Sequence, residues 1–347
     1  MATVRRVLQF LRQPRVVNGI GLSLVALVGI WLAVNLVKEP ANFVNVGLDG
    51  LTRGSVYALI ALGYTLVYGI LQLINFAHGD VFALSGLVAY TVLITIFGLD
   101  SGSSGLAIAG GIVVGLAITM PLFAIINGSI ERVAYRPLRH APRLAPLITA
   151  VGMSFIVSNV SLALYGVQTR SASDLISNAP MFEIGEVVYS WKKFVALAIV
   201  VPVLIALTWF VRTTRQGKAM RAVAQDPEAS AMMGVNVNRT ISVTFFLAGS
   251  LAAGAGMVFL LEYTMRYDTG FELGLIAFTA AVVGGIGNLA GAVLGGVLIG
   301  LIQSFNEGLT WFAAGSDWTR SIVFGILIAI LVFRPQGLLG EQTPEGA

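Results

Sequence analysis

RTTRQGKAMRAVAQDPEASAMMGVNVNRT, residues Arg212–Thr240, is the longest strongly polar segment in an otherwise apolar sequence. Its 29 residues contain 7 of the 38 Lys, Arg, Asp and Glu residues of the chain. Helix-forming residues lie on both sides of Asp226-Pro227. An Asp followed by Pro is typical of a helix start, because Asp caps the first turn and Pro fits the first helical position. The sequence therefore predicts a short helical hairpin in water between apolar regions.

The composition on either side of this segment identifies a membrane protein. The chain has 347 residues, of which 56% are hydrophobic and 11% charged, whereas a soluble domain has about 25% charged residues. It has no Cys and only two His, His78 and His140, so disulfides and thiolate catalysis are excluded and no metal site is expected. The net charge of +4 comes from basic residues in short loops, which does not indicate nucleic-acid binding.

Apolar runs long enough to cross a bilayer recur along the sequence. A transmembrane helix needs about 20 apolar residues, and these runs are continuous rather than alternating, unlike the strands of a barrel. We therefore expect an all-α bundle of about ten transmembrane helices. The expected spans are Val16–Val37, Ser55–Ile74, Gly79–Gly98, Ser104–Ile126, Leu144–Gly166, Phe194–Val211, Ile241–Tyr263, Glu272–Leu289, Gly291–Trp311 and Trp318–Phe333.

One stretch does not fit this pattern. Phe43–Gly54 is interrupted by Asp49 and Arg53 and is too short to span by itself. We expect it to be re-entrant or interfacial, or to belong to an eleventh pass.

Basic residues set the orientation. With ten spans, 14 of the 21 Lys and Arg residues fall on one face, including those of Arg212–Thr240 and of the loop before Leu144. Loops rich in Lys and Arg stay in the cytosol, so this face and both termini are predicted to be cytosolic. The opposite face is predicted to carry acidic loops, of which Gln168–Lys193 is the longest.

Polar residues gather between the second and third expected spans, in Asn75–Asp80 (NFAHGD), with Tyr64 just before them. Polar groups at membrane depth are costly and tend to line a cavity or a path, where an exposed helix N-terminus would suit a substrate carboxylate. Alternatively, the segment is a tight interfacial turn in which Asn75 ends one helix and Asp80 begins the next. Both interpretations remain open at this point.

Other polar residues within the spans are isolated. For Asn159, Glu262 and Glu307 the ordinary interpretation is an interhelical hydrogen bond or an interfacial position. The two glutamates fall at predicted outer ends of spans, so neither is expected to be a proton relay. Gly284–Gly291 contains four glycines and Asn288. Because each glycine costs a helix about 1 kcal/mol relative to alanine, a broken or re-entrant segment and a continuous helix are both open.

The sequence contains no motif for ATP hydrolysis or for other catalysis. Gln216-Gly217-Lys218-Ala219 is the nearest approach to a phosphate-binding loop and lacks both the loop and the hydroxyl, and no catalytic elbow or HExxH is present. Energy for pumping would have to come from an ion gradient or from a partner ATPase. Such a partner needs a rigid cytosolic contact, which the apolar residues after Pro227 could supply by seating in a groove.

Three separated motifs then resemble one family. GLTRGSVYALIALGYTLVYGILQLINFAHGDVF (Gly50–Phe82), RAVAQDPEASAMMGVNVNR (Arg221–Arg239) and FRPQGLLG (Phe333–Gly340) resemble the H-type permeases of branched-chain amino acid ABC transporters. The resemblance implies two permease subunits, usually non-identical, two cytosolic ATPases and an extracytoplasmic solute-binding protein, assembled in the bacterial inner membrane. ATP and Mg would be bound by the ATPases, and no cofactor is expected on this chain.

The resemblance also implies where the working parts lie. The expected divisions are an N-terminal extension with the first helix (1–42), a permease domain (43–340) with its coupling loop at 212–240, and a cytosolic tail (341–347). The residues expected to contact the ATPase are Arg221, Asp226, Pro227, Glu228, Ala229, Met232 and Gly234. We infer a substrate pathway formed by Tyr64, Asn75, His78, Asp80, Asn159 and Asn288.

Branched-chain amino acids are the expected cargo, moved by alternating access. Urea or short-chain amides are the alternative, because permeases for these solutes share similar motifs. Two hypotheses lie outside this class, namely a gradient-driven secondary carrier and a passive channel.

Overall fold

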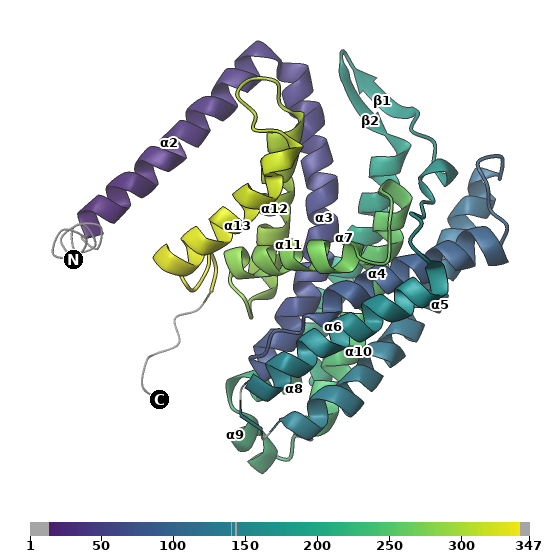
Figure 1. Ribbon diagram of the computed structural model, residues 1–347, viewed down its shortest axis with the longest axis vertical. Coiled ribbons are helices and arrows are strands. Elements are labelled where there is room, and N and C mark those ends of the chain that lie inside the picture. Colours follow the sequence, from purple (N-terminus) through teal and green to yellow (C-terminus); the bar gives the residue numbers. More distant parts are fainter. Residues whose placement is uncertain (1–13, 140, 143, 341–347) are drawn as a thin grey trace.

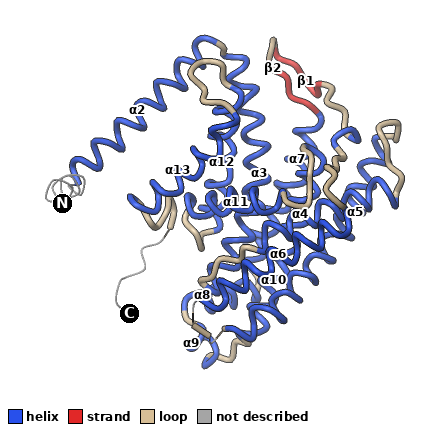
Figure 2. Tube along the Cα trace, in the orientation of Figure 1, coloured by secondary structure: helices blue, strands red, loops and turns tan. Residues whose placement is uncertain are grey.

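The computed structural model describes residues 14–139, 141–142 and 144–340. Within these residues the fold is a helical bundle with one two-stranded hairpin (Figures 1 and 2). Its main helices are α2 (Pro14–Lys38), α3 (Pro40–Leu71), α4 (Ala77–Tyr90), α5 (Gly105–Ile130), α6 (Leu144–Tyr165), α7 (Trp191–Thr213), α8 (Arg215–Gln225), α9 (Pro227–Met232), α10 (Val237–Glu262), α11 (Thr269–Gly284), α12 (Leu289–Gly308) and α13 (Ser316–Phe333). Short π and 3-10 segments are η1 (Thr91–Ile96), η2 (Glu131–Tyr135), η3 (Arg136–Leu138) and η4 (Ser173–Leu175). The strands β1 (Pro180–Ile184) and β2 (Val187–Ser190) pair antiparallel.

The expected all-α membrane fold is confirmed, and most of the ten expected spans are found. Eight helices in the described part are long and apolar enough to cross a membrane, and the shorter apolar helices Ala26–Lys38 and Thr269–Gly284 coincide with two further expected spans. The chain is thus an all-α polytopic membrane protein.

The second span begins earlier than the sequence predicts. Phe43–Gly54 is neither re-entrant nor a separate segment, because it forms the first half of α3, a single helix of 32 residues. At 1.5 Å per residue α3 is about 48 Å long. The two charges that seemed to interrupt it are both paired: Asp49 with Lys193 at 2.7 Å, and Arg53 with Glu307 at 2.5 Å. These pairs allow the charged positions to lie within a continuous helix.

Glycine permits a close backbone approach between α3 and α12. A Cβ added at Gly300 would lie 2.3 Å from the Cα of Gly54, and one added at Gly296 would lie 2.5 Å from the Cα of Ala58. The two backbones therefore touch along this seam, as small residues spaced by one helical turn permit. Around it, α3, α10 and α4 supply most of the fully buried side chains.

Two helix breaks interrupt the bundle. α3 ends at Leu71, with Gln72 in the left-handed conformation, and α4 starts only at Ala77. α11 ends at Gly284 and α12 starts at Leu289, with Gly285 at φ +109° and Gly287 at φ +96°. Of the two alternatives for Gly284–Gly291, the broken helix is the one found. The positive φ angles at its break are accessible to glycine and strained for other residues.

α2 leaves the bundle at Glu39 and extends away from it (Figure 1). Contacts with Trp311 join the last turns of α2 to the loop after α12. The Trp31 indole donates to the carbonyl of Trp311 at 2.7 Å, and the Lys38 ammonium lies 3.2 Å from the centre of the Trp311 ring. The division of the chain into an extension, a permease domain and a tail stays a prediction, and residues 1–13 and 341–347 lie outside the described residues.

The bundle has two distinct ends. β1 and β2 lie at one end, here called the hairpin end, and α8 and α9 lie at the other, the α8–α9 end (Figure 1). α7 runs from the hairpin to α8, so it connects the two ends directly.

Candidate functional site

Both ends of α9 are closed by local hydrogen bonds. At its start, Asp226 Oδ1 accepts from the backbone N–H groups of Glu228 and Ala229, each at 2.9 Å, and Pro227 occupies the first turn. At its end, Gly234 has φ +84° and donates to Ala231, while the next N–H, that of Val235, donates to Ser230. This is the Schellman arrangement, in which a left-handed glycine ends a helix. The helix start that the sequence predicts at Asp226-Pro227 is confirmed.

α8 is anchored on the last turn of α7. Thr214 Oγ1 caps α8 by accepting from Gly217 N at 3.0 Å. A Cβ at Gly217 would lie 2.2 Å from the carbonyl oxygen of Val211, so the α8 backbone rests directly on α7. Arg221 donates to that same carbonyl, where a cation also suits the negative end of the α7 dipole. Arg221 therefore ties the predicted coupling loop to α7.

The remaining predicted coupling residues lie at the surface. Asp226, Pro227, Glu228, Ala229 and Gly234 are all exposed. Met232 and Met233 are 89% and 84% exposed, and such a pair of flexible apolar side chains is typical of a protein-binding surface. The loop thus presents a capped, rigid helix with an uncovered apolar end.

Four of the six predicted pathway residues form one buried cluster. Tyr64 on α3 contacts His78 at the start of α4 edge to face, with ring centroids 4.9 Å apart. A Cβ at Gly63 would lie 2.1 Å from His78 Nε2, so only glycine leaves room for this imidazole. The cluster is completed by Asn75 and Asp80, and all four side chains are at most 4% exposed.

Neighbouring helices supply partners to this cluster. Asn75 Oδ1 accepts from the Tyr135 hydroxyl at 2.7 Å, and Asp80 accepts from the Ser154 hydroxyl. Asn75 Nδ2 and Asp80 Oδ1 are buried without a hydrogen bond among the described residues. The polar groups of the segment are packed inside the bundle, and the helix boundaries, at Leu71 and Ala77, differ from the Asn75 and Asp80 of the interfacial-turn interpretation. A role in a substrate pathway stays a prediction.

The other two predicted pathway residues lie elsewhere. Asn159 is on an exposed face of α6 and donates to the carbonyl of Phe155 one turn earlier in the same helix. Asn288 caps α12, accepting from Gly291 N at 3.1 Å and donating to the carbonyl of Leu339 at 2.8 Å. Both amides have local structural partners, so the structure does not bring them to the buried cluster.

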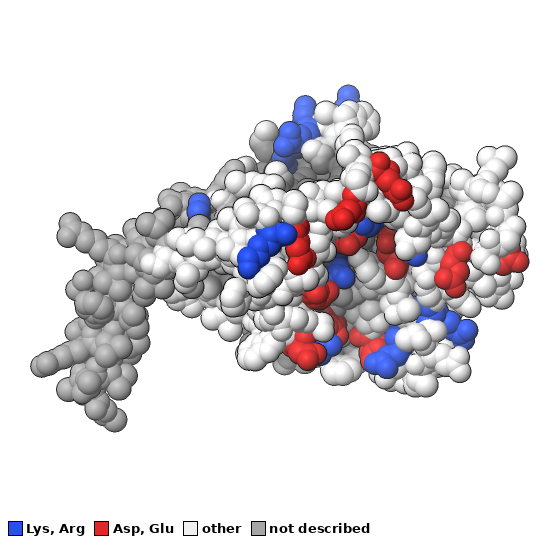
Figure 3. Space-filling model, turned by 90° about the horizontal axis from the view of Figure 1, so that it is seen from above, with Lys and Arg blue, Asp and Glu red and all other residues white. Residues whose placement is uncertain are grey.

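The hairpin end is hollowed, and acidic and basic side chains gather around the hollow (Figure 3). A cavity of about 540 Å³ lies there between α3, α7, α10, α12 and β2. The hairpin is fixed to α3 beside it, because Asn45 accepts from Val188 N at 2.9 Å and donates to the Glu186 carbonyl at 3.0 Å. We call this space the hairpin-end cavity; it is lined by Asn45, Val46, Asp49, Arg53, Asn178, Val188, Ser190, Lys192, Lys193, Glu262, Tyr263, Ser304, Glu307 and Gly308.

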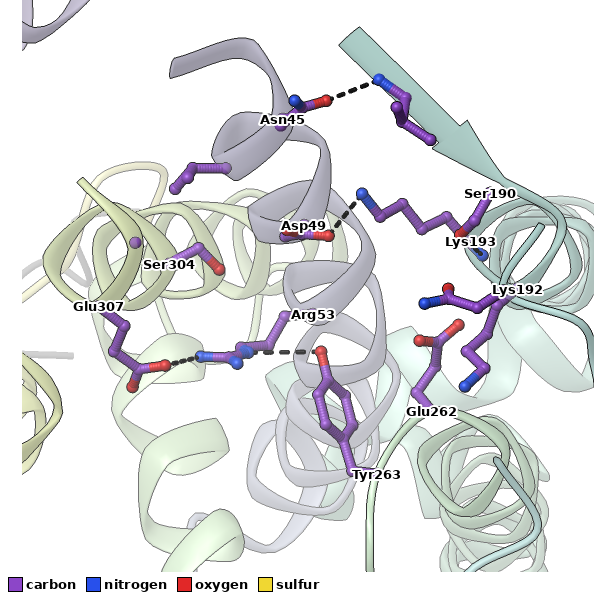
Figure 4. A pocket seen from close by; sticks show the side chains of 14 residues that line it. Asn45, Asp49, Arg53, Ser190, Lys192, Lys193, Glu262, Tyr263, Ser304 and Glu307 are labelled. Atoms are coloured by element: carbon purple, nitrogen blue, oxygen red, sulfur yellow. Dashed lines mark hydrogen bonds and ion pairs between the residues drawn. The ribbon is translucent and has the colours of Figure 1, made fainter. Parts of the chain in front are cut away.

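Two ion pairs cross this cavity (Figure 4). Lys193 binds Asp49, and Arg53 binds Glu307. The Arg53 Nε also donates to the Tyr263 hydroxyl at 3.4 Å. Burial raises the pKa of Tyr263, so this phenol stays neutral.

Lys192 and Glu262 also face the hairpin-end cavity, from the first turn of α7 and the last residue of α10 (Figure 4). No hydrogen bond or ion pair joins the side chain of either residue to any other residue that the structure describes. The sequence interpretation placed Glu262 and Glu307 at span ends but did not identify this cavity. The charges at Asp49 and Arg53 were the available signal, because charged residues in an apolar helix need partners.

Sequence comparison relates most of this chain to known proteins. Residues 47–332 match the family described as "Branched-chain amino acid transport system / permease component". The chain is 37% identical over 313 residues to the high-affinity branched-chain amino acid transport system permease protein BraD of Pseudomonas aeruginosa, covering 88% of this chain and 99% of that protein. It is 34% identical over 309 residues to the corresponding LivH protein of Escherichia coli K12, covering 87% and 97%.

Among solved structures, PsaBC from Streptococcus pneumoniae in complex with Fab aligns with a TM-score of 0.44 at 17% identity, covering 88% of this chain and 97% of that one. The sequence matches extend over nearly the whole length of the relatives. Two of the motifs noted above, Gly50–Phe82 and Arg221–Arg239, lie within the matched residues 47–332, and Phe333–Gly340 follows directly after them. This chain belongs to the permease family of branched-chain amino acid transport systems.

Proposed function

We propose that this chain is the H-type permease subunit of an ATP-driven importer that moves branched-chain amino acids across a bacterial inner membrane. The α8–α9 end and both termini face the cytosol, and the hairpin end faces outward. The support for this orientation is the set of basic residues on and around α8 and α9.

The observation that carries the proposal is the capped helix α9 with its exposed methionine pair. The chain lacks a phosphate-binding loop, so energy must enter from outside it. α9 is rigid at both ends, is attached through α8 to a spanning helix and has an uncovered apolar tip. This is the form expected of a helix that seats in a groove of a partner.

The proposed assembly contains this chain, a second and non-identical permease, two ATPases that bind ATP and Mg, and a solute-binding protein. The binding protein delivers solute at the hairpin end. Closure of the ATPase pair moves α8 and α9, and the spans then reopen toward the cytosol. No cofactor is assigned to this chain.

The test is co-purification of the ATPases with this chain, combined with leucine uptake in proteoliposomes. Full burial of one Met side chain contributes about 1.5 kcal/mol or more, so Met232→Ser together with Met233→Ser is expected to weaken ATPase binding roughly 100-fold. The bundle should stay intact, because neither side chain is packed against it. Met181→Ser, on exposed β1 at the opposite end, is the matched control.

The same experiment separates the alternatives. Leucine uptake without nucleotide by this chain alone would contradict the proposal and favour a gradient-driven carrier. Downhill flux of urea through this chain alone would favour a passive channel. ATP-driven uptake of urea in preference to leucine would support the ATP-driven importer but show that its substrate is urea.

A further inference from the structure

The hairpin-end cavity contains two kinds of charged residue. Asp49 and Lys193 pair with each other, as do Arg53 and Glu307. Lys192 and Glu262 face the same space and attract each other electrostatically, yet they form neither an ion pair nor a hydrogen bond. The cavity thus holds one unpaired positive group and one unpaired negative group on different helices.

Leaving these charges unpaired is costly. One carboxylate oxygen of Glu262, Oε1, is buried and has no hydrogen-bond partner among the described residues, and withdrawing a charged group from water without a partner is unfavourable. The two neighbouring pairs show that long side chains at this depth do reach each other. The Lys192 ammonium and the Glu262 carboxylate thus lie beyond ion-pair distance of each other and both face the cavity, where a third group can contact them.

We propose that the hairpin-end cavity is an entry site for the zwitterionic head of an α-amino acid, with the ammonium on Glu262 and the carboxylate on Lys192. This inference rests on the proposed function and names the chemistry that its outer site recognises. Only a ligand that carries both charges satisfies both residues at once. Val46, Val188 and the Tyr263 ring line the same cavity and supply apolar contacts for a branched side chain. The volume of about 540 Å³ lies within the usual range of small-ligand sites, roughly 300–1,000 Å³.

A neutral solute such as urea carries neither of the two charges that this arrangement binds. It would leave Lys192 and Glu262 unpaired after binding, which makes the site selective against it. The cavity therefore distinguishes the two cargo classes that share the family motifs.

The experiment is a calorimetric titration of the permease–ATPase complex, in lipid nanodiscs and without binding protein. Four probes are used: leucine, isoamylamine (the ammonium without the carboxylate), 4-methylpentanoate (the carboxylate without the ammonium) and urea. Leucine should bind most tightly, each single-charge probe roughly 10- to 100-fold more weakly, as expected for loss of one charge-assisted hydrogen bond, and urea not measurably.

Variants assign each charge to its residue. Glu262→Gln should weaken leucine and isoamylamine but leave 4-methylpentanoate unchanged, and Lys192→Gln should show the reverse selectivity. Lys192→Arg keeps the positive charge and should retain leucine binding. Glu183→Gln, an exposed carboxylate on β1 outside the cavity, is the control and should change nothing.

The proposal is overturned if Lys192→Gln and Glu262→Gln bind leucine as the wild type does, or if either single-charge probe matches leucine. The probe series on the wild type gives this answer even where a variant fails to assemble. Leucine uptake by the wild-type transporter is measured separately. Uptake combined with unchanged binding in the variants refutes only the entry site, whereas absence of ATP-driven leucine uptake refutes the proposed function itself.

Discussion

Replacing Asp226 by Ala tests whether the hydrogen bonds of its N-terminal cap keep α9 folded. α9 has six residues, of which only Ser230 is buried, and helices shorter than about 12 residues are marginal in water by themselves. Asp226→Ala removes two hydrogen bonds of 2.9 Å from the first turn. Loss of such a cap costs about 1 kcal/mol, which lowers the ratio of ordered to opened α9 roughly 5-fold.

Hydrogen exchange measured by mass spectrometry in nanodiscs reports this local opening directly. The amides of residues 228–233 should exchange roughly 5-fold faster in Asp226→Ala than in the wild type. The thermal midpoint of the bundle should not move, because the Asp226 side chain is exposed and bonds only within α9. Asp226→Asn is the matched control, since Asn caps helices about as well as Asp. Equal exchange in the Ala variant and the wild type would refute the claim that the cap orders α9.

Two further predictions concern the bundle interior. Gly300→Ala places a Cβ 2.3 Å from the Cα of Gly54 and should destabilise the chain by about 1–3 kcal/mol. The measurement is the unfolding midpoint in detergent, which should fall. Gly325→Ala is the control: its Cβ meets nothing within 4 Å, so the midpoint should stay unchanged or rise. Asn75→Leu removes the acceptor of the buried Tyr135 hydroxyl and should lower leucine uptake while the ATPases still co-purify; unchanged uptake kinetics would remove Asn75 from the proposed pathway.

Local features were predictable from the sequence, and contacts between distant segments were not. Asp226, Pro227 and Gly234 act within one short helix, so their positions in the sequence were enough to predict where α9 begins. The opposite happened at Asp49 and Arg53. They read as an interruption because their partners, Lys193 and Glu307, lie far along the chain, and periodicity carries no information about such pairs.

The candidate site divides in the same way. The NFAHGD motif was recognised because its polar groups are consecutive, and the structure does bring Asn75, His78 and Asp80 together with Tyr64. Asn159 and Asn288 were grouped with them only as polar residues in or near spans, and each instead has a local backbone partner. The hairpin-end cavity was missed because five separate elements form it.

The attachment of α8 to α7 has a mechanical consequence. α7 has 23 residues and is about 35 Å long. One end is gripped by α8 through Gly217 and Arg221, and the other carries Lys192 into the hairpin-end cavity. In the proposed mechanism, a displacement of α8 therefore acts directly on one end of α7, whose other end lines that cavity. Pro202 lies near the middle of α7, and a helix bends most easily at a proline, so a bend at this residue would weaken the proposed connection between α8 and Lys192.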